Sequence, residues 1–162
     1  MPPPTCDIDR IMAIMASAFE PEYGEAWTRR QVEDALVLGN CHYLLANEAG
    51  EDCTGNDGGD SNSVAGFTLS RGGYGEEELL LFAVAPQFRG RGVGNRLLER
   101  FVQVALGRGA TRLLLEMRRG NPAESIYSRH GFKPVGVRKN YYSTRSGGRL
   151  DAITFSCAAP VN

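Results

Sequence analysis

Residues 84–99 read VAPQFRGRGVGNRLLE and join an apolar run (residues 78–84, ELLLFAV) to an amphipathic run that begins at Val93. The alternating glycines at positions 90, 92 and 94 predict a tight turn between a strand and a helix. The first N–H groups of a helix have no partner within it, and the helix dipole adds partial positive charge there. The stretch therefore predicts a strand–turn–helix unit that binds an anion, with Arg89 and Arg91 as additional donors.

Two common nucleotide motifs are absent from this turn. The Walker pattern GxxxxGK[ST] does not occur, and the alternating glycines do not match the dinucleotide fingerprint GxGxxG. That fingerprint also belongs near the start of a βαβ unit, whereas this turn lies past the middle of the chain. A glycine-rich turn without any ligand is the remaining structural alternative.

The flanking sequence predicts a single α/β domain over residues 1–162, because one domain is the usual expectation at this length. Apolar periodicity predicts helices over residues 7–19, 93–106 and 121–129, and a further helix capped by Thr28 with Gln31 in a capping box. Strands are expected at residues 41–46, 64–70, 78–84, 112–117, 132–140 and 150–157. This order predicts a mixed, mostly antiparallel sheet flanked by helices.

Residues 47–63 read NEAGEDCTGNDGGDSNS and hold neither a large apolar residue nor a basic one. The composition predicts a flexible acidic loop between two strands, with no role in chemistry. Elsewhere, no apolar run approaches the roughly 18 residues of a membrane helix, and the first residues resemble no secretory signal. The four cysteines form no CxxC pair and no metal spacing, so we expect a cytoplasmic protein without a metal or a membrane partner.

Charge is divided unequally along the chain. Residues 1–88 carry four basic and 15 acidic side chains, a balance of -11, whereas residues 89–162 carry 14 basic and four acidic ones, a balance of +10. The two halves are either two differently charged solvated faces or a basic half that meets a polyanion and an acidic half that attracts a cation.

A resemblance to a known family begins at the glycine turn. Residues 89–94, RGRGVG, resemble the (Arg/Gln)-x-x-Gly-x-(Gly/Ala) signature of the GCN5-related N-acetyltransferases, the GNAT family. Residues 125–132, SIYSRHGF, and residues 138–142, RKNYY, followed by Asp151, Ala152 and Ile153, resemble the bacterial branch that acetylates the N-terminal alanine of a ribosomal protein. Residues 26–28, AWT, loosely match a Pro-Trp-Ser element of that branch.

The resemblance implies a GNAT fold and a set of acetyl-CoA contacts. Backbone groups of residues 82–84 would bind the acetyl and pantetheine portion, and the turn would bind the pyrophosphate. The implied cofactor-binding residues are Phe82, Ala83, Val84, Arg89, Gly90, Arg91, Gly92, Val93, Gly94, Asn95 and Asn121. The branch usually separates its asparagine and tyrosine by seven residues, whereas Asn121 and Tyr127 are six apart.

Acyl transfer from a thioester to an amine needs a base for the amine and a proton for the departing thiolate. Glu116 is a lone acid inside the apolar run LLLEM, where burial would favour it as a base near neutral pH. The alternative is a strand residue that pairs with an arginine such as Arg118. Tyr127 is either a core residue or, as the resemblance implies, the acid that protonates the coenzyme A thiolate.

These features predict an acetyl-CoA-dependent N-acetyltransferase with catalytic residues Glu116 and Tyr127. The expected acceptor is a protein N-terminus, in particular the N-terminal alanine of a ribosomal protein, and no direct binding of nucleic acid is expected. Two alternatives remain: an enzyme that acetylates a small amine or a lysine side chain, and a coenzyme A-binding module without catalysis.

Overall fold

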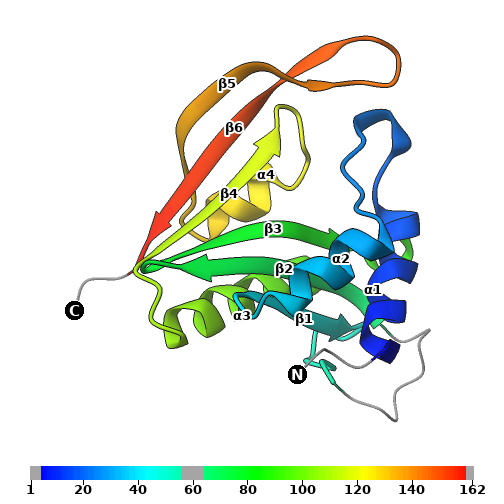
Figure 1. Ribbon diagram of the computed structural model, residues 1–162, viewed down its shortest axis with the longest axis vertical. Coiled ribbons are helices and arrows are strands. Elements are labelled where there is room, and N and C mark those ends of the chain that lie inside the picture. Colours follow the sequence, from blue (N-terminus) through cyan, green and yellow to red (C-terminus); the bar gives the residue numbers. More distant parts are fainter. Residues whose placement is uncertain (1–4, 56–63, 160–162) are drawn as a thin grey trace.

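The computed structural model describes residues 5–55 and 64–159. Within these residues, six strands form one mixed sheet in the order β1-β2-β3-β4-β6-β5, and all neighbours are antiparallel except β3 and β4. Figure 1 shows the helices packed against this sheet, and the half made of β4, β6 and β5 splayed away from β3. The prediction of a mostly antiparallel α/β sheet flanked by helices is confirmed.

Two helices precede the sheet. Helix α1 (Thr5–Ala18) is followed by the 3-10 turn η1 (Pro21–Tyr23) and by helix α2 (Arg29–Val37). The predicted capping box is present: the Thr28 hydroxyl accepts from the Gln31 N–H, and the Gln31 side chain accepts from the Thr28 N–H. Because this box fixes the first turn of α2, residues 19–28 form a defined connection between the two helices.

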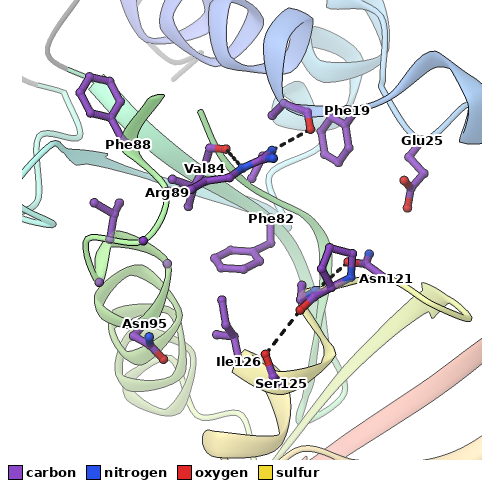
Figure 2. A pocket seen from close by; sticks show the side chains of 18 of the residues that line it. Phe19, Glu25, Phe82, Val84, Phe88, Arg89, Asn95, Asn121, Ser125 and Ile126 are labelled. Carbon is purple, nitrogen blue, oxygen red and sulfur yellow. Dashed lines mark hydrogen bonds between the residues drawn. The ribbon is translucent and has the colours of Figure 1, made fainter. Parts of the chain in front are cut away.

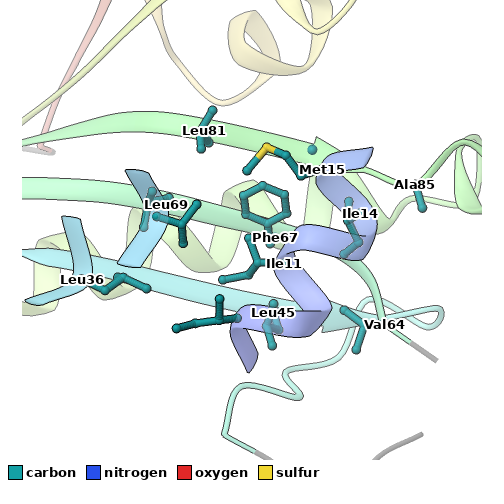
Figure 3. Close-up of a cluster of buried hydrophobic side chains, with 13 residues drawn as sticks. Ile11, Ile14, Met15, Leu36, Leu45, Val64, Phe67, Leu69, Leu81 and Ala85 are labelled. Atoms are coloured by element: carbon teal, nitrogen blue, oxygen red, sulfur yellow. The ribbon is translucent and has the colours of Figure 1, made fainter. Parts of the chain in front are cut away.

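The first half of the sheet consists of β1 (Cys41–Asn47), β2 (Val64–Gly73) and β3 (Glu76–Val84). Helices α1 and α2 pack on one face of these strands. Figure 3 shows this cluster, in which the buried side chains of α1 and α2 meet Leu45, Phe67, Leu69 and Leu81 of the sheet. Burial of these side chains holds residues 19–28 at the carboxyl end of β3.

The second half begins with the short turn η3 (Pro86–Phe88) and helix α3 (Val93–Gly107). Strand β4 (Arg112–Arg118), helix α4 (Glu124–Arg129) and the hairpin of β5 (Lys133–Ser143) and β6 (Arg149–Ala158) follow. Apolar residues of α3, α4, β4 and β6 form a second buried cluster, which includes Leu98, Phe101, Leu115, Tyr127 and Phe155.

Helix α4 starts later than predicted: it begins at Glu124, so the expected start at Asn121 is wrong. Two local causes explain the shift. A residue before proline avoids the helical region, which applies to Asn121 before Pro122. The Asn121 side chain also accepts the N–H of Ala123 (2.9 Å), a turn that competes with helix.

Strands β3 and β4 pair along only part of their length. Their parallel register runs from Glu76↔Arg112 to Leu79↔Leu115, and no pairing between them is found beyond this point within the described residues. The carboxyl ends of the two strands therefore diverge, while Glu116 to Arg118 keep their antiparallel partners in β6. This divergence opens the sheet in its middle.

The expected loop of residues 47–63 is described only as far as Gly55, and residues 56–63 lie outside the described residues. The described part differs from a structureless loop. It folds back on β1, where the Cys53 N–H donates to the Leu45 carbonyl (3.1 Å). Arg100 pairs with Asp52 (3.4 Å) and donates to the Gly50 carbonyl (3.0 Å), so helix α3 holds this segment.

Candidate functional site

A cavity of about 520 Å³ lies where β3 and β4 diverge. Figure 2 shows its walls, which come from the end of α1 and the segment after it, the end of β3, the glycine turn with the start of α3, and the segment leading into α4. Ten of the predicted cofactor residues line it: Phe82, Ala83, Val84, Arg89, Gly90, Gly92, Val93, Gly94, Asn95 and Asn121. The fold thus gathers residues that are up to 39 positions apart in the sequence around one space.

The glycine turn has the backbone geometry that the sequence predicts. Gly90 and Gly92 have positive φ angles of 78° and 84°, a region that other residues rarely adopt. A Cβ atom added to either glycine would meet nothing within 4 Å, so open space adjoins both. The N–H of Arg96 donates to the Gly92 carbonyl (3.1 Å), which leaves the preceding N–H groups of the first helical turn without an intrahelical partner.

The two arginines of the turn have different surroundings. Arg89 donates from Nε to the Val84 carbonyl (3.0 Å) and from Nη2 to the Ala18 carbonyl (2.9 Å), as the dashed lines in Figure 2 show. Arg91 is exposed and does not line the cavity, and its guanidinium lies 5.6 Å from the centre of the Phe88 ring. The side chain of Arg89 is therefore occupied by main-chain carbonyls, whereas that of Arg91 faces solvent.

Two asparagines line the cavity from different elements. Asn95, on the first turn of α3, approaches His130 Nε2 through its side-chain oxygen (3.3 Å). Asn121 uses its side-chain oxygen in the bond to Ala123 described above. Asn121 lies three residues before the start of α4 at Glu124 and six residues before Tyr127.

Tyr127 is buried, with 6% of its surface exposed, and is not among the residues that line the cavity. Its ring packs against those of Phe82, Phe132 and Phe155 at centroid distances of 5.8, 6.1 and 6.5 Å. Burial raises the pKa of the Tyr127 phenol, and the negative charge of Glu25 raises it further. The phenol thus keeps its proton throughout the physiological pH range.

Glu116 differs from the prediction of a carboxylate inside an apolar environment. Its neighbours Leu115 and Met117 point into the cluster with Tyr127, and since side chains alternate along a strand, Glu116 points to the opposite face of β4. Its side chain is 22% exposed and pairs with Arg138 at 3.4 Å. It does not line the cavity, so the arginine pairing considered as the alternative is present.

Glu25 is a cavity residue that the sequence interpretation missed. It is 18% exposed and pairs with Arg118 Nε at 3.3 Å, and the Arg118 guanidinium lies 3.6 Å from the centre of the Tyr23 ring. No motif marks Glu25 in the sequence, because its position beside Arg118 depends on a contact between residues 93 positions apart. Glu25 and Glu20 are thus the two carboxylates among the described residues that line the cavity.

The phenol of Tyr142 on β5 is affected by the charges of both Glu116 and Glu25. Burial raises the pKa of the Tyr142 phenol to about 12, and the charges of Glu116 and Glu25 contribute to the shift. The charge of Glu25 also raises the pKa of Tyr127, so this carboxylate affects both phenols.

The described residues hold neither a metal-ligand cluster nor a membrane-spanning helix. Residues 5–55 and 64–159 hold no group of three or more His, Cys, Asp or Glu side chains that could bind a metal ion. In the same residues, no helix combines the length and apolar character needed to cross a membrane.

The chain is similar in sequence to known acetyltransferases. A model described as Acetyltransferase (GNAT) domain matches residues 39–134. The chain is 35% identical over 98 residues to the ribosomal-protein-bS18-alanine N-acetyltransferase of Haemophilus influenzae, an alignment that covers 60% of this chain and 67% of the relative. It is 30% identical over 139 residues to a provisionally named enzyme of the same description from Bacillus subtilis (strain 168), with 85% and 82% covered.

Structural similarity extends over nearly the whole chain. The crystal structure of the ribosomal-protein-S18-alanine N-acetyltransferase from Escherichia coli superposes with a TM-score of 0.79. The superposition covers 98% of this chain and 92% of that chain at 24% sequence identity. At this identity, the similarity shows a common fold.

Proposed function

This chain belongs to the GNAT family of acetyltransferases, and we propose that its cavity binds acetyl-CoA and directs the acetyl group to the N-terminal amine of a protein. The observation that carries the proposal is the glycine turn, whose free N–H groups at the start of α3 adjoin the cavity between β3 and β4. Relatives at 30–35% identity are named for alanine of ribosomal protein bS18, and we propose such an N-terminal alanine as the acceptor.

The residues of the turn fit a diphosphate. Open space at Gly90 and Gly92 lets an anion approach the backbone, and the dipole of α3, a helix of 15 residues, favours negative charge at its N-terminus. Arg91 is exposed and has no ion pair among the described residues, so it can add a charge-assisted bond. Residues 90–95 would hold the pyrophosphate of acetyl-CoA.

The end of β3 suits the pantetheine arm. Beyond Leu79, the edge of β3 that faces β4 has no ladder partner in the described residues, so backbone groups near Phe82, Ala83 and Val84 remain available for a ligand. A bound arm would add to the sheet in the way that peptides add to an exposed strand edge. Acetyl-CoA, when bound, supplies an acetyl group activated as a thioester.

Protein side chains supply the proton transfers. Roughly a tenth of α-amino groups are already neutral at pH 7, and this fraction can attack the thioester. Glu116 would take the proton that the amine loses during the attack, directly or through a water molecule. Tyr127 would donate the proton that the thiolate needs, since its phenol is protonated at neutral pH. The two residues flank β4 from opposite faces, so the gap between β3 and β4 is the place where both could reach one substrate.

Acidic side chains at the cavity support a basic acceptor. Glu20 and Glu25 line the cavity, as do three arginines, Arg89, Arg118 and Arg129. Glu25 is paired with Arg118, whereas Glu20 has no ion pair within the described residues and can attract a cationic ligand. An N-terminal segment of a ribosomal protein, which is commonly basic, has the matching charge.

The test is incubation of the purified chain with acetyl-CoA and a panel of peptides. One peptide begins with a free alanine, a second has the same sequence with a blocked N-terminus, and a third has a blocked N-terminus and an added lysine. We expect a mass increase of one acetyl group on the first peptide alone. Acetylation of the third peptide would indicate a lysine acceptor, and release of coenzyme A with none of the peptides modified would contradict an N-terminal acceptor.

A further inference from the structure

Arg89 spans two walls of the cavity with a single side chain. Its Nε–H donates to the carbonyl of Val84, the last residue of β3, at 3.0 Å. Its Nη2 donates to the carbonyl of Ala18, the last residue of α1, at 2.9 Å. A guanidinium is planar and presents its donors in a fixed fork, so the two bonds fix the end of α1 relative to the end of β3 (Figure 2).

The Ala18 carbonyl is one of the last carbonyls of a helix, which have no partner within it. The chain continues from Ala18 into residues 19–25, here named the α1–α2 wall, of which Phe19, Glu20 and Glu25 line the cavity. Arg89 itself begins the glycine turn. One side chain therefore joins the α1–α2 wall, the end of β3 and the turn.

The contacts of Arg89 argue against a role for its side chain as a phosphate ligand. Two of its donor groups are bonded to carbonyls, and its own N–H donates to the Pro86 carbonyl (3.3 Å). Arg91, two residues along, has only the Phe88 ring beside its guanidinium among the described residues. The two arginines of the turn thus have separable tasks.

We propose that Arg89 is a positioning residue that connects the coenzyme-binding turn to the α1–α2 wall, so that binding of coenzyme A at the turn orders residues 19–25. The inference rests on the proposed function in taking the turn as the coenzyme site. When coenzyme A orders this wall, the acceptor that binds second loses less conformational entropy on binding. Coenzyme binding then prepares the wall that carries Glu20 and Glu25 for a basic acceptor.

The test uses the full chain and coenzyme A alone. Hydrogen exchange of residues 19–25 is measured by mass spectrometry with and without saturating coenzyme A, and affinity is measured by calorimetry. The variants are Arg89→Gln, which removes the fork, Arg89→Lys, which keeps the charge without the fork, and Arg91→Gln as the matched control.

In the parent chain, coenzyme A should slow exchange in residues 19–25. Both Arg89 variants should lose this protection while their affinity for coenzyme A falls by no more than about threefold, since surface bonds contribute little. Arg91→Gln should weaken coenzyme A binding about tenfold, yet keep the protection at saturation. If Arg89→Gln does not fold, Arg89→Lys carries the same comparison.

Three results would each overturn the proposal. They are protection of residues 19–25 that persists in the Arg89 variants, absence of that protection in the parent chain, and a loss of coenzyme A affinity in Arg89→Gln as large as that in Arg91→Gln. A second measurement compares the affinity for the alanine peptide with and without coenzyme A. We expect coenzyme A to tighten peptide binding about tenfold in the parent chain and not in Arg89→Gln. Failure of every peptide to bind would refute the proposed acceptor and leave the exchange result intact.

Discussion

Tyr127 is positioned by three aromatic rings, and this packing determines the chemistry that its hydroxyl can perform. The rings of Phe82, Phe132 and Phe155 surround it, and burial raises the pKa of its phenol. A proton donor must be protonated at neutral pH, which a phenol already is at its ordinary pKa, while the raised pKa makes it a weaker acid. Contact with Phe82, a cavity residue, brings the tyrosine next to the place where the sheet opens.

We predict that Tyr127→Phe lowers turnover by about 10²-fold or more, the usual scale for loss of a general acid. The substitution keeps the ring, so packing with the neighbouring aromatics and affinity for coenzyme A should change little. Steady-state kinetics give the turnover, and calorimetry with coenzyme A serves as the control. Equal turnover in the variant would remove Tyr127 from the mechanism.

Glu116 and Glu25 are both candidates for the general base, and kinetics can distinguish them. A general base must be ionised, so its protonation adds to the fall in rate at low pH that protonation of the acceptor amine already causes. We predict that Glu116→Gln shifts or flattens the acidic limb of the pH–rate profile, whereas Glu25→Gln raises the KM of the acceptor and leaves the limb as in the parent chain. The measurement is kcat/KM for the alanine peptide across the pH range. A shifted or flattened limb in Glu25→Gln alone would assign the base to Glu25.

Among the elements, the unit of β3, the glycine turn and α3 decides where a ligand can bind. The end of β3 lacks a neighbour on one edge beyond Leu79, and helix α3 presents its N-terminus beside that edge. The positive φ angles of Gly90 and Gly92 allow the chain to reverse within a few residues. Both kinds of unpaired backbone group therefore meet at one cavity.

We predict that Gly92→Val abolishes measurable binding of coenzyme A, because the side chain would occupy the space that adjoins the turn. A valine at a φ of 84° also strains the backbone, so a control with equal strain is needed. Gly109→Val serves this purpose, since Gly109 has a φ of 98°, meets nothing within 4 Å of an added Cβ, and lies just beyond the other end of α3. Calorimetry should detect normal binding in the control. Normal binding in Gly92→Val would contradict the proposed site.

At the scale of the whole molecule, ion pairs connect the acidic first half of the chain with the basic second half. Within residues 5–55 and 64–159, four pairs join the two halves of the chain: Arg100–Asp52, Arg108–Glu77, Arg112–Glu76 and Arg118–Glu25. The charge asymmetry of the sequence is therefore partly internal to the fold. At the cavity, Glu25 belongs to one of these pairs, whereas Glu20 is a lining carboxylate that takes part in none of them.

The most buried carboxylate among these pairs lies at the other end of β3 from the cavity. Glu77 is 2% exposed, accepts from Arg108 at the end of α3, and accepts from the Ser70 hydroxyl at 2.6 Å. Burial acts to raise the pKa of the Glu77 carboxyl, yet the bonds from Arg108 and Ser70 outweigh it and lower the pKa. A carboxyl with a lowered native pKa stabilises the fold above its unfolded pKa and loses that effect as the pH falls through the native value.

We predict that Glu77→Gln lowers the free energy of unfolding at pH 7 by about 2–3 kcal/mol, because Arg108 and Ser70 lose their charged partner. The difference from the parent chain should shrink as the pH falls below the ordinary value of 4.5, where the parent carboxyl also begins to be neutralised. Urea denaturation at pH 7 and at acidic pH gives both values. Glu78→Gln, which disrupts the exposed pair with Arg71, is the matched control and should change stability by less than about 0.5 kcal/mol. An equal effect of both substitutions would contradict the prediction.

The sequence by itself determined the elements and the family. Helices, strands, caps and turns depend on residues a few positions apart, so the local sequence is enough to predict them. Examples are the apolar periodicities, the Thr28–Gln31 capping box, and the glycines at positions 90 and 92. The same signals, with the resemblance, indicated the helix N-terminus as the anion site. The late start of α4 was also a local matter, which Asn121 before Pro122 could have indicated.

Only the tertiary structure decided how these parts meet. The opening between β3 and β4, the fork of Arg89 on Ala18 and Val84, and the pairing of Glu25 with Arg118 join residues far apart in the chain. The partner of Glu116 likewise proved to be Arg138 on another strand. Such contacts depend on which faces pack together, and a local pattern does not contain that information because packing is set by the whole core.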